Sequence, residues 1–310
     1  MKTPRGASLL TMKTNSFKAW VLACRPKTLT GAAAPVFIGG AYGLRYAMRV
    51  LHLGEHGIYA LFYPFLFALL FALVMQIEAN LVNDYFDYLK GTDREDRLGP
   101  ERACAQGWIT PGAMKVGLAV VALLALAVGL PLIGYGGWEM VIVGVVCLVF
   151  CWLYTTHLSY MGLGDVLVVV FFGLVPVVFT AYVIAHCITV QLVFLGLAMG
   201  LATDCLLIVN NYRDIDQDRV SGKRTIIVRL GRKAGLVLYL FCGLSAVAIV
   251  SVIAGWWSLL LLPYVAFQIR NYLSMRRLTG KALNGVLGAT AANIFLFGVL
   301  VAAVSLFFNV

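Results

Sequence analysis

The sequence predicts an all-α, polytopic membrane protein that crosses the bilayer nine times. Of its 310 residues, 61% are hydrophobic and 12% are charged, whereas about a quarter of the residues in soluble domains are charged. Apolar runs of about 20 residues, the length of a helix that crosses a ~30 Å hydrocarbon core, recur along the chain. These runs are centred near Pro35, Leu69, Val121, Val146, Phe172, Ala198, Phe241, Leu261 and Phe297.

A polar head precedes the first apolar run. It lacks the short apolar stretch and small-residue cleavage site of a signal peptide, so we interpret residues 1–19 as a cytoplasmic tail. Residues 20–310 then form a single transmembrane domain. Short turns rich in Gly and Trp, at residues 134–138 and 255–257, separate the third run from the fourth and the seventh from the eighth.

The distribution of lysine and arginine orients the predicted bundle. Cytoplasmic loops carry an excess of these residues. With the N-terminus in the cytoplasm, all of them except Arg45 and Arg49 lie in the tail or in cytoplasmic loops. We therefore expect the N-terminus inside the cell and the C-terminus outside it. Contact of the basic loops with anionic lipid accounts for the net charge of +10, so the lipid bilayer is the expected partner and no nucleic acid is required.

Acidic residues gather in two short segments at predicted cytoplasmic helix ends. The first acidic window (residues 83–96) follows the second run and holds Asp84, Asp87, Asp93, Glu95 and Asp96. The second acidic window (residues 210–225) follows the sixth run and holds Asp214, Asp216 and Asp218. The pattern V-N-x-Y-x-D begins one residue before each window, at residues 82–87 and 209–214, which indicates an internal duplication.

Asparagine and aspartate recur every four residues in each window, which places their side chains on one helix face. Clustered carboxylates repel one another unless cations lie between them, and Mg²⁺ takes one or two carboxylates together with water and phosphate oxygens. We therefore expect two Mg²⁺ ions. The expected ligands are Asn83, Asp84, Asp87, Asp93, Asn210, Asp214 and Asp218. The expected catalytic acids are Asp84, Asp87, Asp214 and Asp218. Glu95 and Asp96 are alternatives to Asp93, and solvated loop acids are the alternative to a metal site.

Basic residues in and after the second acidic window suit phosphate oxygens. Lysine acts there as a point charge and arginine as a fork of donors. Lys223 is the preferred phosphate ligand because it follows the metal face after a turn at Gly222, and Arg224 adjoins it. The neighbouring arginines are Arg213, Arg219 and Arg229. The alternative is that these residues only set the topology.

A transporter is the alternative class, since many carriers also combine several spans with internal repeats. Carriers place their ion sites near the bilayer midplane, whereas these acids lie at cytoplasmic helix ends beside bases that suit phosphate. The pattern therefore favours an enzyme.

The two windows closely resemble the aspartate-rich motifs of the UbiA superfamily of intramembrane prenyltransferases. The matching segments are NDYFDYLKGTD (83–93) and NNYRDIDQDRVSGKRT (210–225). Four shorter stretches look like the branch that prenylates 1,4-dihydroxy-2-naphthoate for menaquinone synthesis. They are RPKT (25–28), GPER (99–102), GLGD (162–165) and TIIVRLG (225–231).

The resemblance implies a UbiA-type bundle around a central cavity, in the plasma (inner) membrane of a bacterium, with the active site facing the cytoplasm. It implies Mg²⁺-dependent transfer of a polyprenyl chain from polyprenyl diphosphate to 1,4-dihydroxy-2-naphthoate with loss of CO₂, which gives demethylmenaquinone. The alternative aromatic acceptors within the superfamily are 4-hydroxybenzoate, the haem O precursor and homogentisate.

Further residues near the windows are candidates for binding the two substrates. Arg25, Lys27 and Asn80 offer donors to the acceptor, Asp165 can relay a proton, and tyrosines can stabilise an allylic cation through their ring faces. The expected substrate-binding residues are Arg25, Lys27, Asn80, Tyr85, Tyr154, Asp165, Asn211, Lys223 and Arg224. Glu78 and Asp204 each lie about one turn before a window. We expect them to contact the residues that bind metal or substrate without binding either themselves, and pairing with other polar groups inside the membrane is the alternative.

Overall fold

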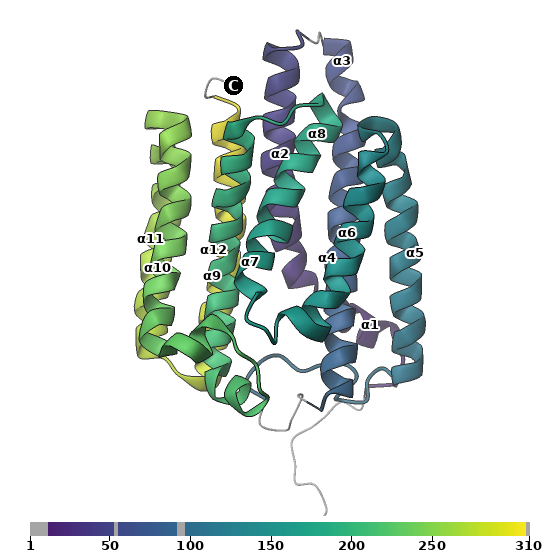
Figure 1. Ribbon diagram of the computed structural model, residues 1–310, viewed down its shortest axis with the longest axis vertical. Coiled ribbons are helices and arrows are strands. Elements are labelled where there is room, and N and C mark those ends of the chain that lie inside the picture. Colours follow the sequence, from purple (N-terminus) through teal and green to yellow (C-terminus); the bar gives the residue numbers. More distant parts are fainter. Residues whose placement is uncertain (1–11, 53–54, 92–96, 308–310) are drawn as a thin grey trace, which may run out of the picture.

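Helical segments of α, 3₁₀ or π type lie at the centres of the predicted apolar runs. The computed structural model describes residues 12–52, 55–91 and 97–307 (Figure 1). The α-helices of these residues are α1 (Phe17–Cys24), α2 (Leu29–Arg49), α3 (Glu55–Ala60), α4 (Phe62–Leu89), α5 (Pro111–Gly136), α6 (Glu139–Leu153), α7 (Gly164–Val169), α8 (Val175–Ala185), α9 (Val190–Val220), α10 (Ile226–Ala254), α11 (Leu262–Arg277) and α12 (Leu283–Ser305). The boundary predicted after residue 19 falls inside α1, and Ala19 is completely buried.

Seven helical stretches within the described part of the chain are long and apolar enough to cross a membrane. One of them, Ile226–Arg277, spans 52 residues and contains both α10 and α11. Helix α2 is not among the seven. The prediction of an all-helical membrane protein is therefore confirmed, whereas the count of nine spans is not.

The eighth predicted run is displaced in the structure. Its predicted centre, Leu261, lies in a 3₁₀ turn at Gly255–Leu261, and α11 begins only afterwards and has 16 residues. The turn is apolar, whereas α11 carries the buried polar residues Gln268 and Asn271. A search for apolar runs therefore places the centre of the eighth run in the 3₁₀ turn rather than in α11.

Small residues bring the central helices into close contact. A Cβ atom added to Gly173, between α7 and α8, would lie only 2.4 Å from the carbonyl oxygen of Gly196 and the Cα of Gly200 on α9. Helix association in a membrane gains little from the hydrophobic effect, so it depends on such close packing. These glycines therefore fix α9, which carries the second acidic window, against the α7–α8 segment.

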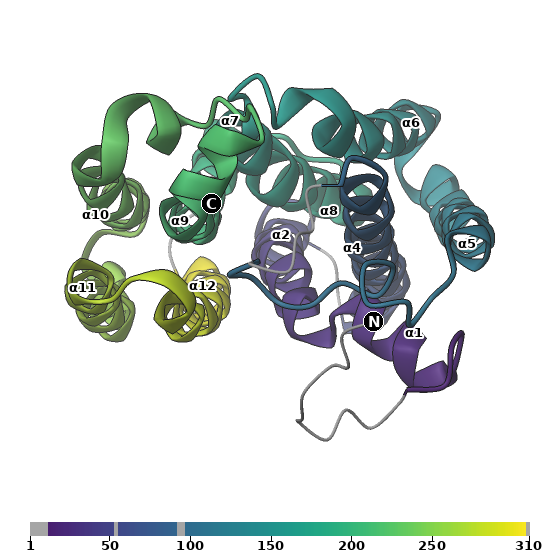
Figure 2. The ribbon, with the colours of Figure 1, turned by 90° about the horizontal axis from the view of Figure 1, so that it is seen from below.

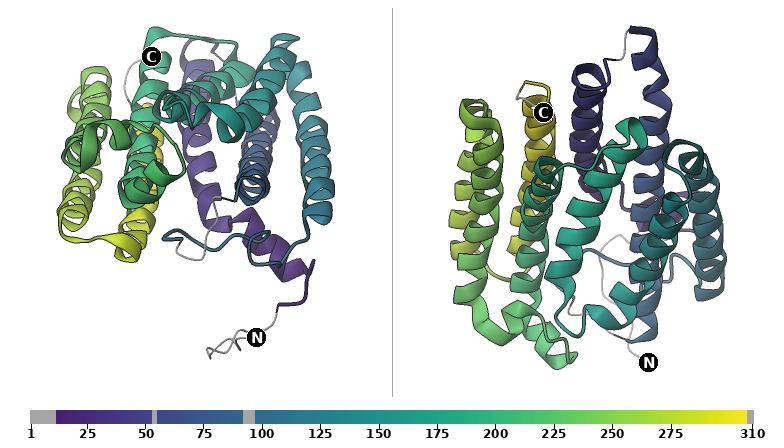
Figure 3. Two further views of the ribbon diagram at one scale, coloured as in Figure 1. Left: turned by 60° about the horizontal axis from the view of Figure 1, so that its bottom comes forward. Right: turned by 45° about the horizontal axis from the view of Figure 1, so that its top comes forward.

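The helices are arranged as two outer pairs around a central group (Figure 2). Helices α10 and α11 lie at one edge beside α9 and α12, and α5 and α6 lie at the other edge. Helices α2, α4 and α8 lie between these edges, as the turned views also show (Figure 3). Helix α1 and the end of α12 lie at opposite ends of the bundle (Figure 1).

Both acidic windows lie at the same end of the bundle. Helices α4 and α9 run in the same direction, and their C-terminal ends lie at the bottom of Figure 1, near α1. The π turn at Tyr154–Leu158 lies close to this end, and a second π turn, Val170–Leu174, joins α7 to α8. Such turns interrupt regular helical hydrogen bonding and often occur at functional sites.

Candidate active site

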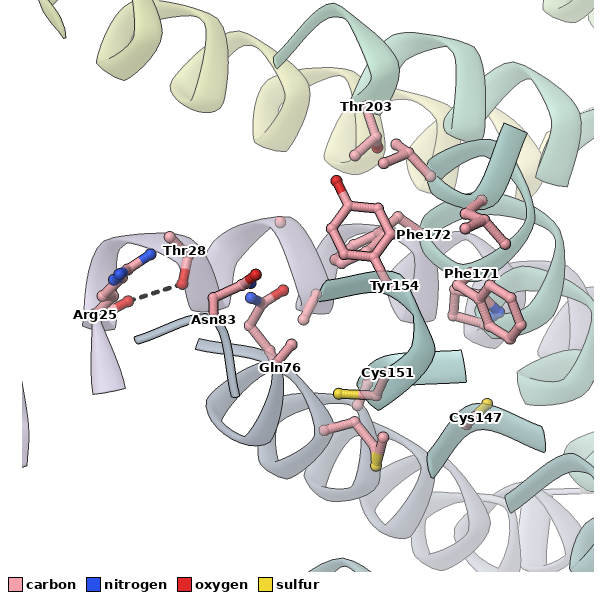
Figure 4. A pocket seen from close by; sticks show the side chains of 18 of the residues that line it. Arg25, Thr28, Gln76, Asn83, Cys147, Cys151, Tyr154, Phe171, Phe172 and Thr203 are labelled. Carbon is pink, nitrogen blue, oxygen red and sulfur yellow. Dashed lines mark hydrogen bonds between the residues drawn. The ribbon is translucent and has the colours of Figure 1, made fainter. Parts of the chain in front are cut away.

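A cavity of about 1110 Å³ lies between α2, α4, α5, α6, the α7–α8 segment and α9. Most of its wall is apolar and includes Phe71, Met140, Phe171 and Phe172. Polar side chains gather at the end where α4 and α9 finish, and Figure 4 shows a group of the residues that line the cavity. The cavity therefore joins a polar end to a long apolar interior.

The first acidic window presents an amide and a carboxylate to the cavity. Asn83 and Asp87 both line it. Arg102 lies 2.6 Å from the carboxylate of Asp87, and 9% of each of these two side chains is exposed. The hydroxyl of Thr155 donates to Oδ1 of Asn83 at 2.8 Å. Asp87 is thus a cavity carboxylate with a buried arginine beside it.

Asp84 has a different environment from Asp87. Its two carboxylate oxygens accept the backbone N–H groups of Ala103 and Cys104 at 2.8 and 2.9 Å, and the residue is only 1% exposed. These bonds fix the 97–110 loop, and Asp84 does not line the cavity. Its role as a metal ligand stays a prediction. Asp93, Glu95 and Asp96 lie outside the described residues.

The second acidic window presents amides and bases to the cavity. Asn210, Asn211, Arg213 and Lys223 line it, whereas Asp214 and Asp218 do not. Each of these two acids pairs with one of the lining bases. Asp214 binds Arg213 at 2.6 Å, and Asp218 lies 3.7 Å from Nζ of Lys223. The second window therefore turns positive charge toward the cavity.

The 159–163 loop joins the two windows. Lys90 donates to the carbonyl oxygens of Thr155 and Thr156 at 3.0 and 2.8 Å, and its Nζ lies 3.9 Å from the ring centre of Tyr160. The pKa of Lys90 is lowered, chiefly because the amine is partly buried. On the other side, the backbone N–H of Arg224 donates to the carbonyl of Tyr160 at 3.1 Å. The loop is thus held between residues of both windows.

Gly162 permits this close contact. Its φ angle is +83°, and an added Cβ would lie 2.3 Å from the carbonyl oxygen of Arg224. Only glycine adopts such a conformation readily. The predicted phosphate ligand Arg224 itself is exposed and does not line the cavity.

The corner between α1 and α2 adds two cations to the cavity wall. Arg25 and Lys27 both line it, and Arg25 has a left-handed backbone with φ of +49°. Burial, together with the nearby Arg102, lowers the pKa of Arg25 to about 10. Nη2 of Arg25 is buried and has no hydrogen-bond partner among the described residues. This guanidinium is therefore suited to an anionic group inside the cavity.

Asn80 holds this corner in place and does not face the cavity. Its amide nitrogen donates to the carbonyl of Cys24 and to the hydroxyl of Thr28, both at 2.9 Å. The hydroxyl of Thr28 in turn donates to the carbonyl of Arg25 at 2.9 Å (Figure 4). Asn80 therefore acts on the position of Arg25, and its direct contact with substrate stays a prediction.

Tyr154 and Asp165 also line the cavity. The hydroxyl of Tyr154 points toward Thr203 of α9 (Figure 4). Tyr85 does not line the cavity and packs against Phe86 with ring centres 5.3 Å apart. The structure therefore brings one of the two predicted tyrosines to the site and leaves the other in the helix packing.

The intramembrane acids lie behind the site. Glu78 is 0% exposed and accepts a hydrogen bond from Nε1 of Trp152 at 3.1 Å. Asp204 lies 3.8 Å from the sulfur of Cys242. Neither acid lines the cavity, so both remain candidates for support.

The donors at the polar end fit Mg²⁺ in kind. Asp87 supplies a carboxylate, and Asn83, Asn210 and Asn211 supply amide oxygens to one cavity. Within the described residues, no three His, Cys, Asp or Glu side chains form a metal cluster on their own. Mg²⁺ usually binds one or two carboxylates and takes its remaining ligands from water and substrate phosphates. The site thus suits a metal ion that arrives with a phosphorylated substrate.

Sequence reasoning missed several polar side chains of the site, including Gln76, Glu101 and Thr203. Arg97, Arg102 and Asn284 all line the cavity, and Asn284 comes from α12, far from both windows along the chain. Arg102 lies within the GPER stretch that resembles one branch of the family. That resemblance marked the stretch as functionally relevant but assigned no role to Arg102. Asn284 had no such signal.

Known proteins resemble this chain over most of its length. The UbiA prenyltransferase family matches residues 47–284. A 1,4-dihydroxy-2-naphthoate octaprenyltransferase of Haemophilus influenzae is 34% identical over 85% of this chain and 81% of its own. The protein of that name from Mycobacterium tuberculosis is 38% identical over 75% of this chain and 76% of its own. A UbiA homolog from Archaeoglobus fulgidus, solved bound to GPP and Mg²⁺, has a TM-score of 0.58 at 15% identity over 92% of this chain and 99% of its own, which is a likeness of fold.

Proposed function

The chain belongs to the UbiA prenyltransferase family, and we propose that it prenylates 1,4-dihydroxy-2-naphthoate. The donor is polyprenyl diphosphate, and the product is demethylmenaquinol, the hydroquinone form of demethylmenaquinone, formed with loss of CO₂. Relatives at 34% and 38% identity that carry this acceptor in their names support the choice. Membership of this family also identifies the chain as a prenyltransferase. The alternative that it is a transporter is therefore rejected.

The main observation behind the proposal is that one cavity has a polar end and an apolar interior. Its polar end combines Asp87 with the amides and bases of the second acidic window, which suits a diphosphate and its metal ions. Its apolar interior, which extends between α4, α5 and α6, suits a prenyl chain that must stay out of water. Both halves of a prenyl diphosphate therefore find a matching surface.

The diphosphate lies between the two windows in this proposal. Asn83, Asp87 and Asn210 would hold Mg²⁺, with Asp214 and Asp218 contributing from the second window, and Lys223 would bind a phosphate oxygen. Bound Mg²⁺ would supply Lewis-acid stabilisation of the charge on the leaving diphosphate. A UbiA homolog solved with GPP and Mg²⁺ supports the choice of metal. We keep the expectation of two ions.

The acceptor lies beside the α1–α2 corner. Arg25, whose buried Nη2 lacks a partner among the described residues, binds its carboxylate, and Lys27 adds a second positive charge. Tyr154 and Asp165 face the same cavity and contact the ring and its hydroxyls. The ring of Tyr154 also offers a π face to the allylic cation.

The proposed reaction balances without an added base. The allylic carbon–oxygen bond breaks, and its electron pair leaves with the diphosphate. The ring carbon that bears the carboxylate forms a new bond to the allylic carbon. The bond from that ring carbon to the carboxylate then breaks, its electrons return to the ring, and CO₂ leaves. No net proton is transferred, so Asp165 needs only to relay protons among the hydroxyls.

We also propose a topology of nine crossings. Helix α2, with 21 residues, and the division of Ile226–Arg277 into α10 and α11 supply the two spans beyond the seven. The N-terminus and both windows face the cytoplasm, because the basic residues gather at that end. The chain forms one transmembrane domain in the inner membrane of a bacterium.

Prenyl transfer by the purified protein in detergent tests this function. The mixture contains Mg²⁺, a polyprenyl diphosphate and either 1,4-dihydroxy-2-naphthoate or 4-hydroxybenzoate, and the extracted lipid is identified by mass. We expect a demethylmenaquinone-type product from the naphthoate alone. Product from the benzoate alone would reject the acceptor and keep the chemistry, and absence of any Mg²⁺-dependent product would reject both.

A further inference from the structure

Arg213 is bonded through all three nitrogens of its guanidinium. Nε and Nη2 donate to the two carboxylate oxygens of Asp214 at 2.7 and 2.6 Å. Nη2 also donates to Oδ1 of Asn210, and Nη1 to Oδ1 of Asn284, both at 2.7 Å. Only 1% of the Arg213 side chain is exposed. The guanidinium is therefore fixed against two predicted metal ligands of the second acidic window.

Asn284 connects this arrangement to the other half of the site. Its amide nitrogen donates to the carbonyl of Leu98 at 2.8 Å, and Leu98 belongs to the 97–110 loop that Asp84 of the first window fixes. Arg213 is thus held from both sides. A side chain braced in this way keeps its position while ligands enter and leave.

Arg213 lines the cavity, whereas Asp214 does not. A metal ion that approaches Asp214 from the cavity therefore meets a fixed positive charge first. An arginine cannot lose this charge by deprotonation in a protein, and like charges at short distance repel strongly where water is excluded. The geometry opposes binding of a free divalent cation at this window.

The first acidic window is different. Asp87 lines the cavity itself, together with Asn83, although Arg102 lies 2.6 Å from its carboxylate. Arg102 lines the cavity as well, but it lies beside Asp87 and leaves this carboxylate in the cavity wall, whereas Asp214 is outside the wall that Arg213 forms. The two windows, alike in sequence, differ in what they offer to a metal ion that arrives alone.

We propose that Arg213 is a built-in counter-cation of the second acidic window, which keeps that window from binding a free divalent cation until a diphosphate is present. The negative charge of a diphosphate offsets both the guanidinium and the metal, so metal and diphosphate bind there together. Arg213 is a positioning residue in this scheme. The inference rests on the proposed diphosphate chemistry and not on the identity of the acceptor.

Binding of Mn²⁺ alone to the purified protein in detergent tests the proposal, with the free ion measured by electron paramagnetic resonance. We expect Arg213→Gln to raise the affinity for Mn²⁺ at least tenfold and Arg213→Lys to leave it near the wild-type value. The same Arg213→Gln variant should bind geranyl thiolodiphosphate with Mg²⁺ more weakly, measured by calorimetry. Opposite changes in the two affinities are the signature of a counter-cation.

The matched control is Arg219→Gln. Arg219 lies on the same helix, is 53% exposed and pairs with exposed Asp216 at 3.6 Å, so its loss should leave both affinities unchanged. Equal or weaker Mn²⁺ binding by Arg213→Gln would overturn the proposal, because the residue would then only support the metal ligands. These measurements need no turnover, so a failed prenylation assay would leave their outcome intact.

Two further variants, Asp214→Asn and Asp87→Asn, test the counter-cation if Arg213→Gln does not fold. Because Arg213 masks Asp214, Asp214→Asn should change the affinity for Mn²⁺ alone less than threefold. Asp87→Asn, which removes the carboxylate that the first window presents to the cavity, should lower it at least tenfold. A loss of equal size in the two variants would reject the counter-cation.

Discussion

The two acidic windows share a sequence pattern and differ in what they present to the cavity. In the first, Asn83 and Asp87 face the cavity, and Phe86 occupies the position before the aspartate that ends the V-N-x-Y-x-D pattern. In the second, Arg213 occupies that position, binds the neighbouring Asp214 and itself faces the cavity. The first window thus presents a carboxylate, paired with Arg102, to the cavity, whereas the second presents a guanidinium. Similar spacing of ligands does not imply similar sites.

Replacing the paired aspartates should have the largest effect. Asp87→Asn and Asp214→Asn should each abolish prenyl transfer, a loss of roughly 10³-fold or more in kcat that corresponds to at least ~4 kcal/mol. The protein should stay folded in detergent, as size-exclusion chromatography can check. Turnover in a radiolabelled prenyl assay is the measurement, and Asp216→Asn, at an exposed acid of the same window, is the control. Wild-type turnover in either variant would remove the metal-binding model.

Removal of Asp84 should lower the stability of the protein. Asp84→Ala leaves two buried backbone N–H groups of the 97–110 loop without acceptors, at a cost of ~1–3 kcal/mol for each unsatisfied group. We expect a lower midpoint of thermal unfolding in detergent. Asn211→Ala, at the equivalent position of the second window, should change substrate binding with little effect on that midpoint. The reverse order of the two effects would contradict this division.

Gly162→Ala should weaken the loop that joins the windows. The new Cβ would lie 2.3 Å from the carbonyl of Arg224, at a φ of +83°, and such strain costs ~1–3 kcal/mol. The loop must then move away from the second window, so we expect kcat/KM for the prenyl diphosphate to fall and hydrogen exchange of residues 159–163 to speed up. Gly134→Ala, where an added Cβ meets nothing within 4 Å, is the control. An unchanged exchange rate would show that the contact between Gly162 and Arg224 does not stabilise the loop.

The smallest predicted effect belongs to Lys223. Lys223→Gln should raise KM for the prenyl diphosphate about tenfold, the equivalent of ~1.4 kcal/mol, because one partly exposed base that lines the cavity is lost. KM for the acceptor should not change. Arg224→Gln, next in sequence but outside the cavity wall, should alter neither value. Equal effects of the two substitutions would mean that the charge acts at long range.

Helical periodicity accounts for much of what the sequence could predict. Residues 76, 79, 83 and 87 of α4 line the cavity at the spacing of one helix face, so the prediction that Asn83 and Asp87 share a face is confirmed. The same spacing turns Tyr85 away from Asn83 by about two steps of 100°, which agrees with its absence from the cavity wall. Asp84 is three residues before Asp87 and shares a side of the helix with it, so its position outside the cavity wall could not be predicted from the periodicity.

Contacts between distant segments could not be predicted from the sequence. The pairing of Asp87 with Arg102 depends on how the 97–110 loop folds back, and Asn284 reaches Arg213 only because α12 packs beside α9. Likewise, the direction in which Asp214 points is set by its bond to Arg213 rather than by its position in the motif. These features follow from tertiary packing, which spacing along one helix does not encode.

The crossing that contains α11 depends on a short 3₁₀ segment. The 16 residues of α11 extend ~24 Å at 1.5 Å per residue, less than the hydrocarbon thickness of about 30 Å that most bilayers present. The apolar 3₁₀ segment Gly255–Leu261, which runs directly into α11, adds ~14 Å at about 2.0 Å per residue. Because hydrogen bonds in a 3₁₀ helix have poorer geometry than those in an α-helix, amide hydrogen exchange in a bilayer should be faster in this segment than in α11.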